Sequence, residues 1–230
     1  MIIQDVFKVL YSPLKAFEKL AKAPDVKGPA FILLVTLLAS FGVQYINSSK
    51  TLIETEQGSR VYVPISATDI FSGRIVPVLT ETAFRFFLNW LIYGAVFLLV
   101  LKLFRAKEGP WHHLFIIIGY TLIVAAVFSI LNAIIVSTFP EIRLDFEVWN
   151  GALEGDEEML QRMIQTYEDT WGSLFVYQLI PYFSIIIATW TAALGAIAIH
   201  FLREVSWNRA LIITAIVSAV SLLLSGPLAF

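Results

Sequence analysis

Four polar side chains within the apolar stretches of the chain are of the types that bind ions and small solutes. They are Arg85, Asn89, Asn132 and His200. Arg85 and Asn89 are four residues apart, so they would share one face of a helix. Ionisable groups inside membrane-spanning helices commonly mark the path of a substrate or ion. If the four side chains converge on one central cavity, they form a site for a small solute.

Each of these side chains also has a structural interpretation. Glu81 precedes Arg85 by four residues, so the two can form an ion pair near the end of a helix. Asparagine and histidine inside apolar helices more often join neighbouring helices by hydrogen bonds, worth about 1 kcal/mol each, than bind a transported solute. No relay of Asp, Glu and His runs through the apolar stretches, which speaks against a proton pump.

Motifs of the common catalytic sites are missing from the sequence. It contains no HExxH, no GxSxG and no phosphate-loop lysine. It has no cysteine, which excludes disulfides, thiolate catalysis and Cys-ligated metals. His112 and His113 are adjacent and point to different helix faces, so they favour anchoring at a membrane interface over metal binding. We therefore expect no metal, no cofactor and no enzymatic activity.

Five long apolar blocks must position the polar residues. They lie near residues 29–46, 84–104, 114–139, 173–202 and 210–228. Each is about long enough to cross a bilayer as a helix, and helices satisfy their own backbone hydrogen bonds in hydrocarbon. Charged residues make up 15% of the chain, against about 25% in soluble domains. The sequence predicts an all-α integral membrane protein, with a five-helix bundle over residues 29–230 and a first span that is retained.

The distribution of Lys and Arg predicts the orientation of this bundle. Ten lie on the side of the N-terminus and five lie in the longer loops on the other side. Basic residues are kept in the cytoplasm, so we expect a multi-pass protein of the cell membrane with a cytoplasmic N-terminus. An odd number of spans would then place Phe230 outside.

Residues 1–28 form an amphipathic segment ahead of the first span. Pro13 suits the first position of a helix, and Leu14, Phe17 and Ala21 would make an apolar stripe beside basic residues. Such a helix can lie in the membrane interface with its lysines toward anionic headgroups, or it can pack beneath the bundle. The two interpretations are compatible. The proposed membrane-surface residues are Lys15, Phe17, Lys19 and Lys22.

Two long loops are expected outside. In the loop 47–82, alternating residues on either side of Gly58 predict a β-hairpin. The loop 140–172 is acidic and contains a helical pattern from Glu157 to Thr170. Its acidic residues do not have the spacing of a calcium-binding loop. A solvated helix therefore explains this loop better than a cation site.

Small residues recur at spacing four in the later apolar blocks. The fourth block carries Ser184, Ala188, Ala192 and Ala196. Small side chains let helix backbones approach closely in a membrane. We expect this stripe to be a packing surface within a compact bundle, and the same stripe could instead mediate homo-oligomerisation.

Three strings of the sequence resemble the Yip1-domain membrane proteins. SPLKAFEKLAKAPDVKGPAFILL resembles the leading segment of that family, LFIIIGYTLIVAAVF its Gly-Tyr third span, and WTAALGAIAIHFLREVSWNRALIITAI its final hairpin. The family's proline a few residues after Gly-Tyr is replaced here by Ile123 and Val124. The resemblance implies five spans and a cytosolic N-terminus. In eukaryotic members it implies membrane trafficking and association with small GTPases.

These observations favour a non-catalytic membrane scaffold or membrane-organising factor of the Yip1 type. A small-solute transporter or channel using the polar residues of spans two to four is the alternative, and a membrane-embedded enzyme is a third interpretation. The expected partners are the lipid bilayer and a protein at the cytoplasmic face. Net charge is −2, so nucleic acid is not expected.

Overall fold

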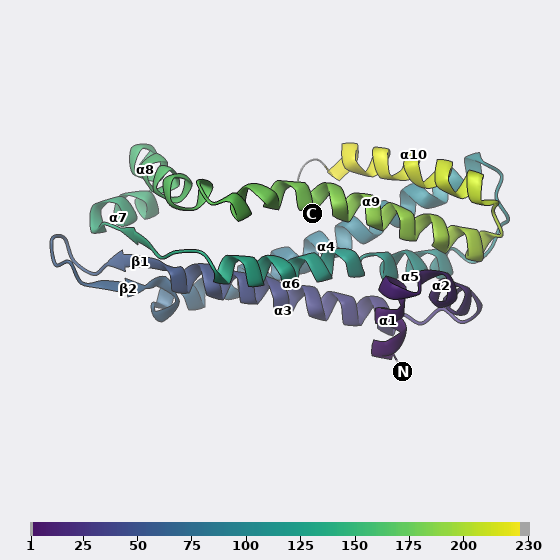
Figure 1. The fold of residues 1–230 in the computed structure, drawn as a ribbon, viewed down its shortest axis with the longest axis horizontal. Helices are drawn as coiled ribbons and strands as arrows, with labels where there is room; N and C mark the ends of the chain where they lie inside the picture. The colour runs from purple at the N-terminus through teal and green to yellow at the C-terminus, as the bar shows by residue number, and fades with distance from the viewer. Residues whose placement is uncertain (1, 226–230) are drawn as a thin grey trace. The chain divides into compact units, whose positions relative to one another are not determined.

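A computed structural model describes residues 2–225 of the chain and confirms the predicted all-α membrane class (Figure 1). In the described residues four helical stretches are long and apolar enough to cross a membrane, and a shorter apolar helix follows them. In the four stretches, between 17 and 56% of the most apolar window is buried within the protein, which leaves the remaining apolar surface available to lipid. The stretches are Lys27–Lys50, Phe71–Leu103, Trp111–Ser137 and Phe175–Arg203, with Trp207–Ser221 as the shorter helix.

The helices that carry these stretches differ in their bounds from the predicted spans. Helix α3 covers Lys27–Lys50 and α4 covers Asp69–Leu103, with Pro77 inside it. The third stretch consists of α5 (Trp111–Thr121) and α6 (Ile123–Ser137). Helix α9 covers Phe175–Arg203 and α10 covers Trp207–Ser225. The last residues of the predicted span 210–228, and Phe230, lie outside the described residues.

The chain divides into two compact units, and several of the long helices belong partly to each. Unit 1 consists of Met1–Leu37, Glu81–Phe128 and Phe183–Phe230. It contains two short helices, α1 (Ile2–Tyr11) and α2 (Pro13–Lys22), besides segments of the long ones. Its core is a large hydrophobic cluster whose fully buried side chains include Phe17, Phe97, Leu114, Ile117 and Leu194.

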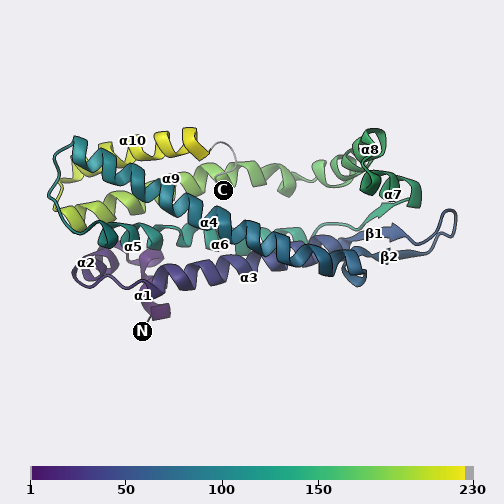
Figure 2. The ribbon, with the colours of Figure 1, turned by 180° about the vertical axis from the view of Figure 1, so that it is seen from behind.

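Helices α4, α9 and α10 approach closely within unit 1, and Figures 1 and 2 show α10 alongside α9. Gly195 lies at this contact. A Cβ at Gly195 would lie 3.0 Å from the Phe97 ring and 3.3 Å from the Thr214 methyl. A larger residue would push the helices apart, because neither neighbour has free space to occupy.

Unit 2 consists of Leu38–Thr80 and Ser129–Tyr182 and contains a small sheet. Strands β1 (Thr51–Glu54) and β2 (Tyr62–Pro64) pair antiparallel, with Ile53 opposite Val63. Gly58, at φ +74°, lies in the turn between them, where a glycine is least strained. Strand β3 (Ile142–Leu144) pairs parallel with β1 and comes from the acidic loop. The sequence did not predict this third strand.

Two helices of the acidic loop complete unit 2. They are α7 (Phe146–Glu154) and α8 (Glu157–Tyr167), followed by a π-helical turn over Glu168–Gly172. The Asp156 carboxylate caps α8 by accepting hydrogen bonds from the backbone N–H groups of Glu158 and Met159. The core of the unit is aromatic and aliphatic, and its buried residues include Phe139, Trp149 and Trp171.

Candidate functional site

The N-terminal segment folds as a pair of helices that packs against α5 within unit 1 (Figure 1). Helix α2 buries Ala16, Phe17 and Leu20, and α1 buries Val6 and Val9. Phe17 is completely buried in the same cluster as α5. The pair is therefore fixed to the membrane bundle by an apolar face.

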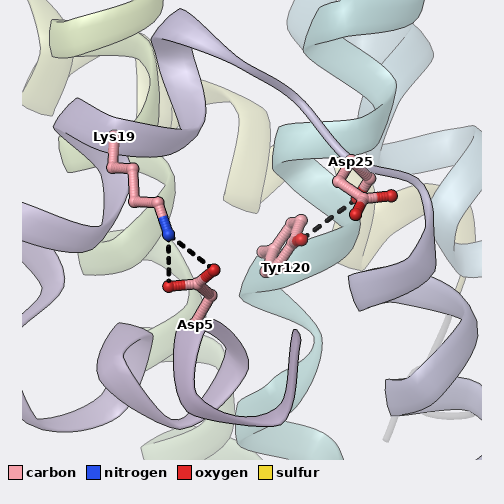
Figure 3. A network of polar contacts seen from close by, with 4 residues as sticks. All are labelled: Asp5, Lys19, Asp25 and Tyr120. Carbon is pink, nitrogen blue, oxygen red and sulfur yellow. Dashed lines mark hydrogen bonds and ion pairs between the residues drawn. The ribbon is translucent and has the colours of Figure 1, made fainter. Parts of the chain in front are cut away.

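The linker between α2 and α3 is held by the Gly-Tyr pair of α5. Tyr120 is almost fully buried, and its hydroxyl donates a hydrogen bond to the backbone carbonyl of Asp25 at 3.0 Å (Figure 3). A Cβ at Gly28 would lie 2.0 Å from the Tyr120 ring, and one at Gly119 would lie 2.7 Å from Pro29. Glycine at both positions allows the start of α3, which follows the linker, to lie directly on α5.

The lysines of the predicted membrane-surface segment differ in their partners. The Lys19 ammonium contacts both carboxylate oxygens of Asp5, at 2.8 and 2.7 Å (Figure 3). This ion pair joins α1 to α2. Lys22 pairs with Glu18 at 2.9 Å. Lys15 is exposed and has no ion pair among the described residues.

A second apolar face of the helix pair is exposed. Three of its residues are spaced about one turn apart and share one side of α1, and the fourth is exposed in the first turn of α2. These side chains are 45 to 70% exposed, although the opposite sides of both helices are buried. The face consists of Ile3, Phe7, Tyr11 and Leu14.

Two of the four polar residues proposed as a solute site, Arg85 and His200, contact residues close to them in sequence. Arg85 pairs with Glu81 at 2.5 Å, and both side chains are about half exposed. His200 shares a hydrogen bond with the backbone carbonyl of Val205 at 2.6 Å, and its ring stacks on Trp207. Asn89, like these two, belongs to unit 1. None of the four is among the described residues that line the three cavities reported below.

The fourth member of that set, Asn132, belongs to unit 2. Its side-chain oxygen is buried and has no hydrogen-bond partner among the described residues. An unpaired amide oxygen in an apolar helix is unfavourable. Asn132 is thus the one member of the set whose surroundings leave a polar atom available.

The small-residue stripe of α9 is only partly buried in unit 1. Ser184 lies at an exposed position, Ala188 and Ala192 are half-buried, and Ala196 is buried. The neighbouring row, displaced by one residue, is the more deeply buried one. That row is Ile187, Thr191, Leu194, Gly195 and Ala198.

Unit 2 contains a cavity of about 250 Å³ that sequence reasoning missed. Its lining includes the indoles of Trp149 and Trp171 and the polar groups of Asn47 and Arg74. The Asn47 side-chain oxygen is buried without a hydrogen-bond partner among the described residues. The lining comes from two regions that are far apart in sequence, α3 to α4 and α7 to the π-helical turn, so no local pattern could have revealed it.

Tyr167 closes part of this cavity. Its hydroxyl is 2.8 Å from the hydroxyl of Thr51 on β1. Burial raises the pKa of Tyr167, while the hydrogen bond with Thr51 and the positive charge of Arg74 lower it to a smaller extent. The phenol is therefore neutral near pH 7 and acts as a hydrogen-bonding group. Residues 2–225 hold no cluster of three or more His, Asp or Glu side chains that could bind a metal.

Comparison with known proteins identifies the family. A model of the Yip1 domain matches residues 7–226, nearly the whole chain. The search of curated proteins and the search of solved structures each found no match. The chain therefore belongs to the Yip1 domain family, as its Gly-Tyr motif and final hairpin suggested.

Proposed function

We propose that this member of the Yip1 domain family is a non-catalytic membrane scaffold whose N-terminal helix pair forms its working surface. One observation carries the proposal: the pair has two apolar faces. Phe17 and its neighbours fix one face to the bundle, and Ile3, Phe7, Tyr11 and Leu14 are exposed on the other. A face of this kind, next to lysines, suits the boundary between headgroups and acyl chains.

The scaffold would hold this surface in a constant position relative to the spans. The Lys19–Asp5 ion pair and the Tyr120 hydrogen bond restrain the helix pair and its linker (Figure 3). A protein partner at the membrane surface would then meet a preformed site, and would not have to order a flexible segment on binding. The polar sides of α1 and α2 are available for such a partner.

The membrane contact can be tested in the full-length protein reconstituted into vesicles. Because the chain has no cysteine, single changes Phe7→Cys and Tyr11→Cys can carry one fluorophore each. We expect quenching by bromine-labelled lipids at both positions and little quenching at the control Glu157→Cys, an exposed position of α8 in the acidic loop. Equal quenching at all three positions would contradict the membrane-facing role.

The proposed orientation places the N-terminus in the cytoplasm, because ten Lys and Arg residues lie on that side and five on the other. Cysteines introduced at Ser49, Ala106 and Glu154 can be labelled with an impermeant reagent on intact cells. We expect labelling at positions 49 and 154 only. Labelling at position 106 alone would reverse the orientation.

Transport of a small solute is the second candidate function, and the unpaired oxygen of Asn132 favours it. A transporter would move solute across proteoliposomes, and Asn132→Leu would abolish that flux. Under the scaffold proposal, vesicles with and without the protein have equal permeability to ions and small neutral solutes. Flux that depends on Asn132 would contradict the scaffold proposal and support the transporter proposal.

A further inference from the structure

The last residue of α9, Arg203, is a buried cation at one end of the helices of unit 1. Its exposed fraction is 6%, although the turn to α10 follows directly. A guanidinium carries five N–H donors. Among residues 2–225, Arg203 makes one long hydrogen bond, from Nη2 to the carbonyl oxygen of Pro110 at 3.4 Å, and no ion pair with a carboxylate. A buried cation is unfavourable unless an anion balances it.

Arg203 lines two cavities formed by the α4–α5 turn and the α9–α10 turn. The smaller cavity has a volume of about 490 Å³ and is also lined by Arg105 and Arg209. The larger has a volume of about 1230 Å³ and is also lined by Lys102 and Arg105. Both lie within unit 1. Including Arg203 and Lys107, five basic side chains line one or both of these cavities.

The charge around Arg203 is predominantly positive. Glu204 is already engaged by an ion pair with Lys107, and Glu108 lines the rim of the larger cavity. Lys102, Arg105 and Arg209 lie at exposed positions and have no ion pair among the described residues. An anion entering either cavity would therefore meet uncompensated cations.

The backbone of the two turns holds this arrangement in place. Arg105 and Glu204 have φ values of 48° and 52°, left-handed conformations that end α4 and α9 sharply. The Lys107–Glu204 ion pair joins one turn to the other. A Cβ at Gly109 would lie 2.1 Å from Nη1 of Arg203, so the glycine backbone lies directly against the guanidinium. The cation is thus positioned by turn geometry.

One wall of the larger cavity is apolar. Ala95, Leu98 and Leu99 of α4 line it below the basic rim, and Leu99 is 68% exposed. Trp111, at the start of α5, lies at the rim and is 64% exposed, as is common for tryptophan at membrane–water interfaces. A basic rim above an apolar wall suits a ligand with an anionic head and an apolar tail.

We propose that this pair of cavities binds the phosphate group of an anionic phospholipid, with Arg203 as the central ligand. The guanidinium can donate two parallel hydrogen bonds to phosphate oxygens. Lys102, Arg105 and Arg209 supply the surrounding positive charge, and an acyl chain lies along α4 at Leu98 and Leu99. Basic pockets between membrane helices bind anionic headgroups in this way.

The test uses the full-length protein in a neutral detergent. Dioleoyl phosphatidylglycerol, dioleoyl phosphatidylcholine and sodium phosphate are each added at matched ionic strength. Native mass spectrometry counts the lipids retained, and a thermal melt reports stabilisation. We expect retention of phosphatidylglycerol with a higher melting temperature, and at least tenfold weaker retention of phosphatidylcholine.

Two substitutions distinguish the effect of removing the Arg203 charge from the effect of displacing it. Arg203→Gln removes the central donors and should weaken phosphatidylglycerol binding about tenfold or more. Gly109→Ala keeps every charge but displaces the guanidinium, and should also weaken binding. The matched controls are Gly42→Ala, where an added Cβ meets nothing within 4 Å, and Arg162→Gln in unit 2. Both controls should bind as the unchanged protein does.

If Arg203→Gln does not fold, the exposed variants Arg209→Gln and Lys102→Gln give the same test, each with a smaller loss. Equal binding of the two lipids, or unchanged binding in all variants at the basic rim, would overturn the proposal. Stabilisation by sodium phosphate as strong as that by phosphatidylglycerol would overturn the lipid assignment in favour of a soluble phosphate. None of these readouts depends on the N-terminal helix pair, so the scaffold proposal is tested separately.

Discussion

Each of the two units is stabilised internally by a different kind of contact. Unit 1 relies on close steric fits between helices, at Gly28 against Tyr120 and at Gly195 against Phe97. Unit 2 relies in addition on hydrogen bonds between polar side chains and the backbone groups of its loops and strands. There the Glu54 carboxylate accepts from the backbone N–H groups of Arg60 at 2.8 Å and Phe146 at 3.3 Å.

The difference follows from composition. Apolar helices in unit 1 satisfy their own backbone hydrogen bonds, so only the fit of their side chains can specify how they pack. The loops of unit 2 leave backbone groups unpaired, and these groups need carboxylates, hydroxyls or strands as partners. Substitutions should therefore act mainly through volume in unit 1 and through polar partners in unit 2.

The largest effect on stability is expected at Tyr120. Replacing this buried side chain by alanine removes its packing against Gly28 and leaves a cavity, which should lower the free energy of unfolding by about 3–5 kcal/mol. Tyr120→Phe removes only the hydrogen bond to Asp25 and should cost about 0.5–1.5 kcal/mol. Thermal unfolding in detergent measures both, with the exposed Tyr11→Ala as control. Equal losses for Phe and Ala would mean that polarity, and not volume, dominates in unit 1.

A smaller loss is expected at Gly195. Leucine at this position would meet Phe97 and Thr214 and should cost about 1–3 kcal/mol by overpacking. Ala192→Leu, at a half-buried position, should cost less, and Ser184→Leu, at an exposed position, should change the melting temperature little. An equal loss for all three would show that the predicted stripe is itself the packing surface, and would weaken the argument from Gly195.

The membrane class of the fold could be predicted from sequence because apolar length is a local property. Helices α3 and α9 follow directly from their apolar blocks. Strands β1 and β2 also have a local signal, since their residues alternate around a glycine turn. Strand β3 has only three residues and pairs with β1, from which α4, α5 and α6 separate it in the sequence. Its pairing depends on tertiary structure, which no short pattern reports.

The candidate sites were harder to predict for the same reason. The sequence pattern weights Lys15, Lys19 and Lys22 equally, but Lys19 and Lys22 have carboxylate partners from α1 and α2. It counted Arg203 as one basic residue among ten, because the burial of its guanidinium depends on two turns that meet only in the folded chain. The sequence shows how many charged residues the chain has, but it does not show which of them have an oppositely charged partner in the folded protein.

The pH dependence of the protein's stability should reveal the contribution of Glu54 in unit 2. Backbone hydrogen bonds from Arg60 and Phe146 lower the pKa of Glu54 below its ordinary value of 4.5. The unfolded chain then binds the proton more readily than the folded one, so stability rises with pH. The contribution of Glu54 should be complete above about pH 4.5 and disappear as the pH falls through the lowered pKa.

Melting temperatures of the unchanged protein and of Glu54→Gln test this expectation. The difference between them should be largest near pH 7 and should shrink as the pH falls below 4.5. The control Glu157→Gln, at an exposed position of α8, should show no such trend. A difference that is constant with pH would remove Glu54 as an organising group of unit 2.

The smallest effect is expected at the Lys19–Asp5 ion pair of unit 1. The Lys19 side chain is 54% exposed and that of Asp5 is 17% exposed, so water and salt screen most of the attraction. Lys19→Gln should lower the free energy of unfolding by no more than about 1 kcal/mol, and this loss should vanish at high salt. Phe17→Ala on the same helix should cost about 3–5 kcal/mol, because Phe17 is fully buried. Urea unfolding of both variants at low and high salt provides the comparison. If Lys19→Gln destabilises the protein as much as Phe17→Ala does, electrostatic attraction and not apolar burial holds the N-terminal helices in place. The contrast between the two units would then not apply to the helix pair that we propose as the working surface of the scaffold.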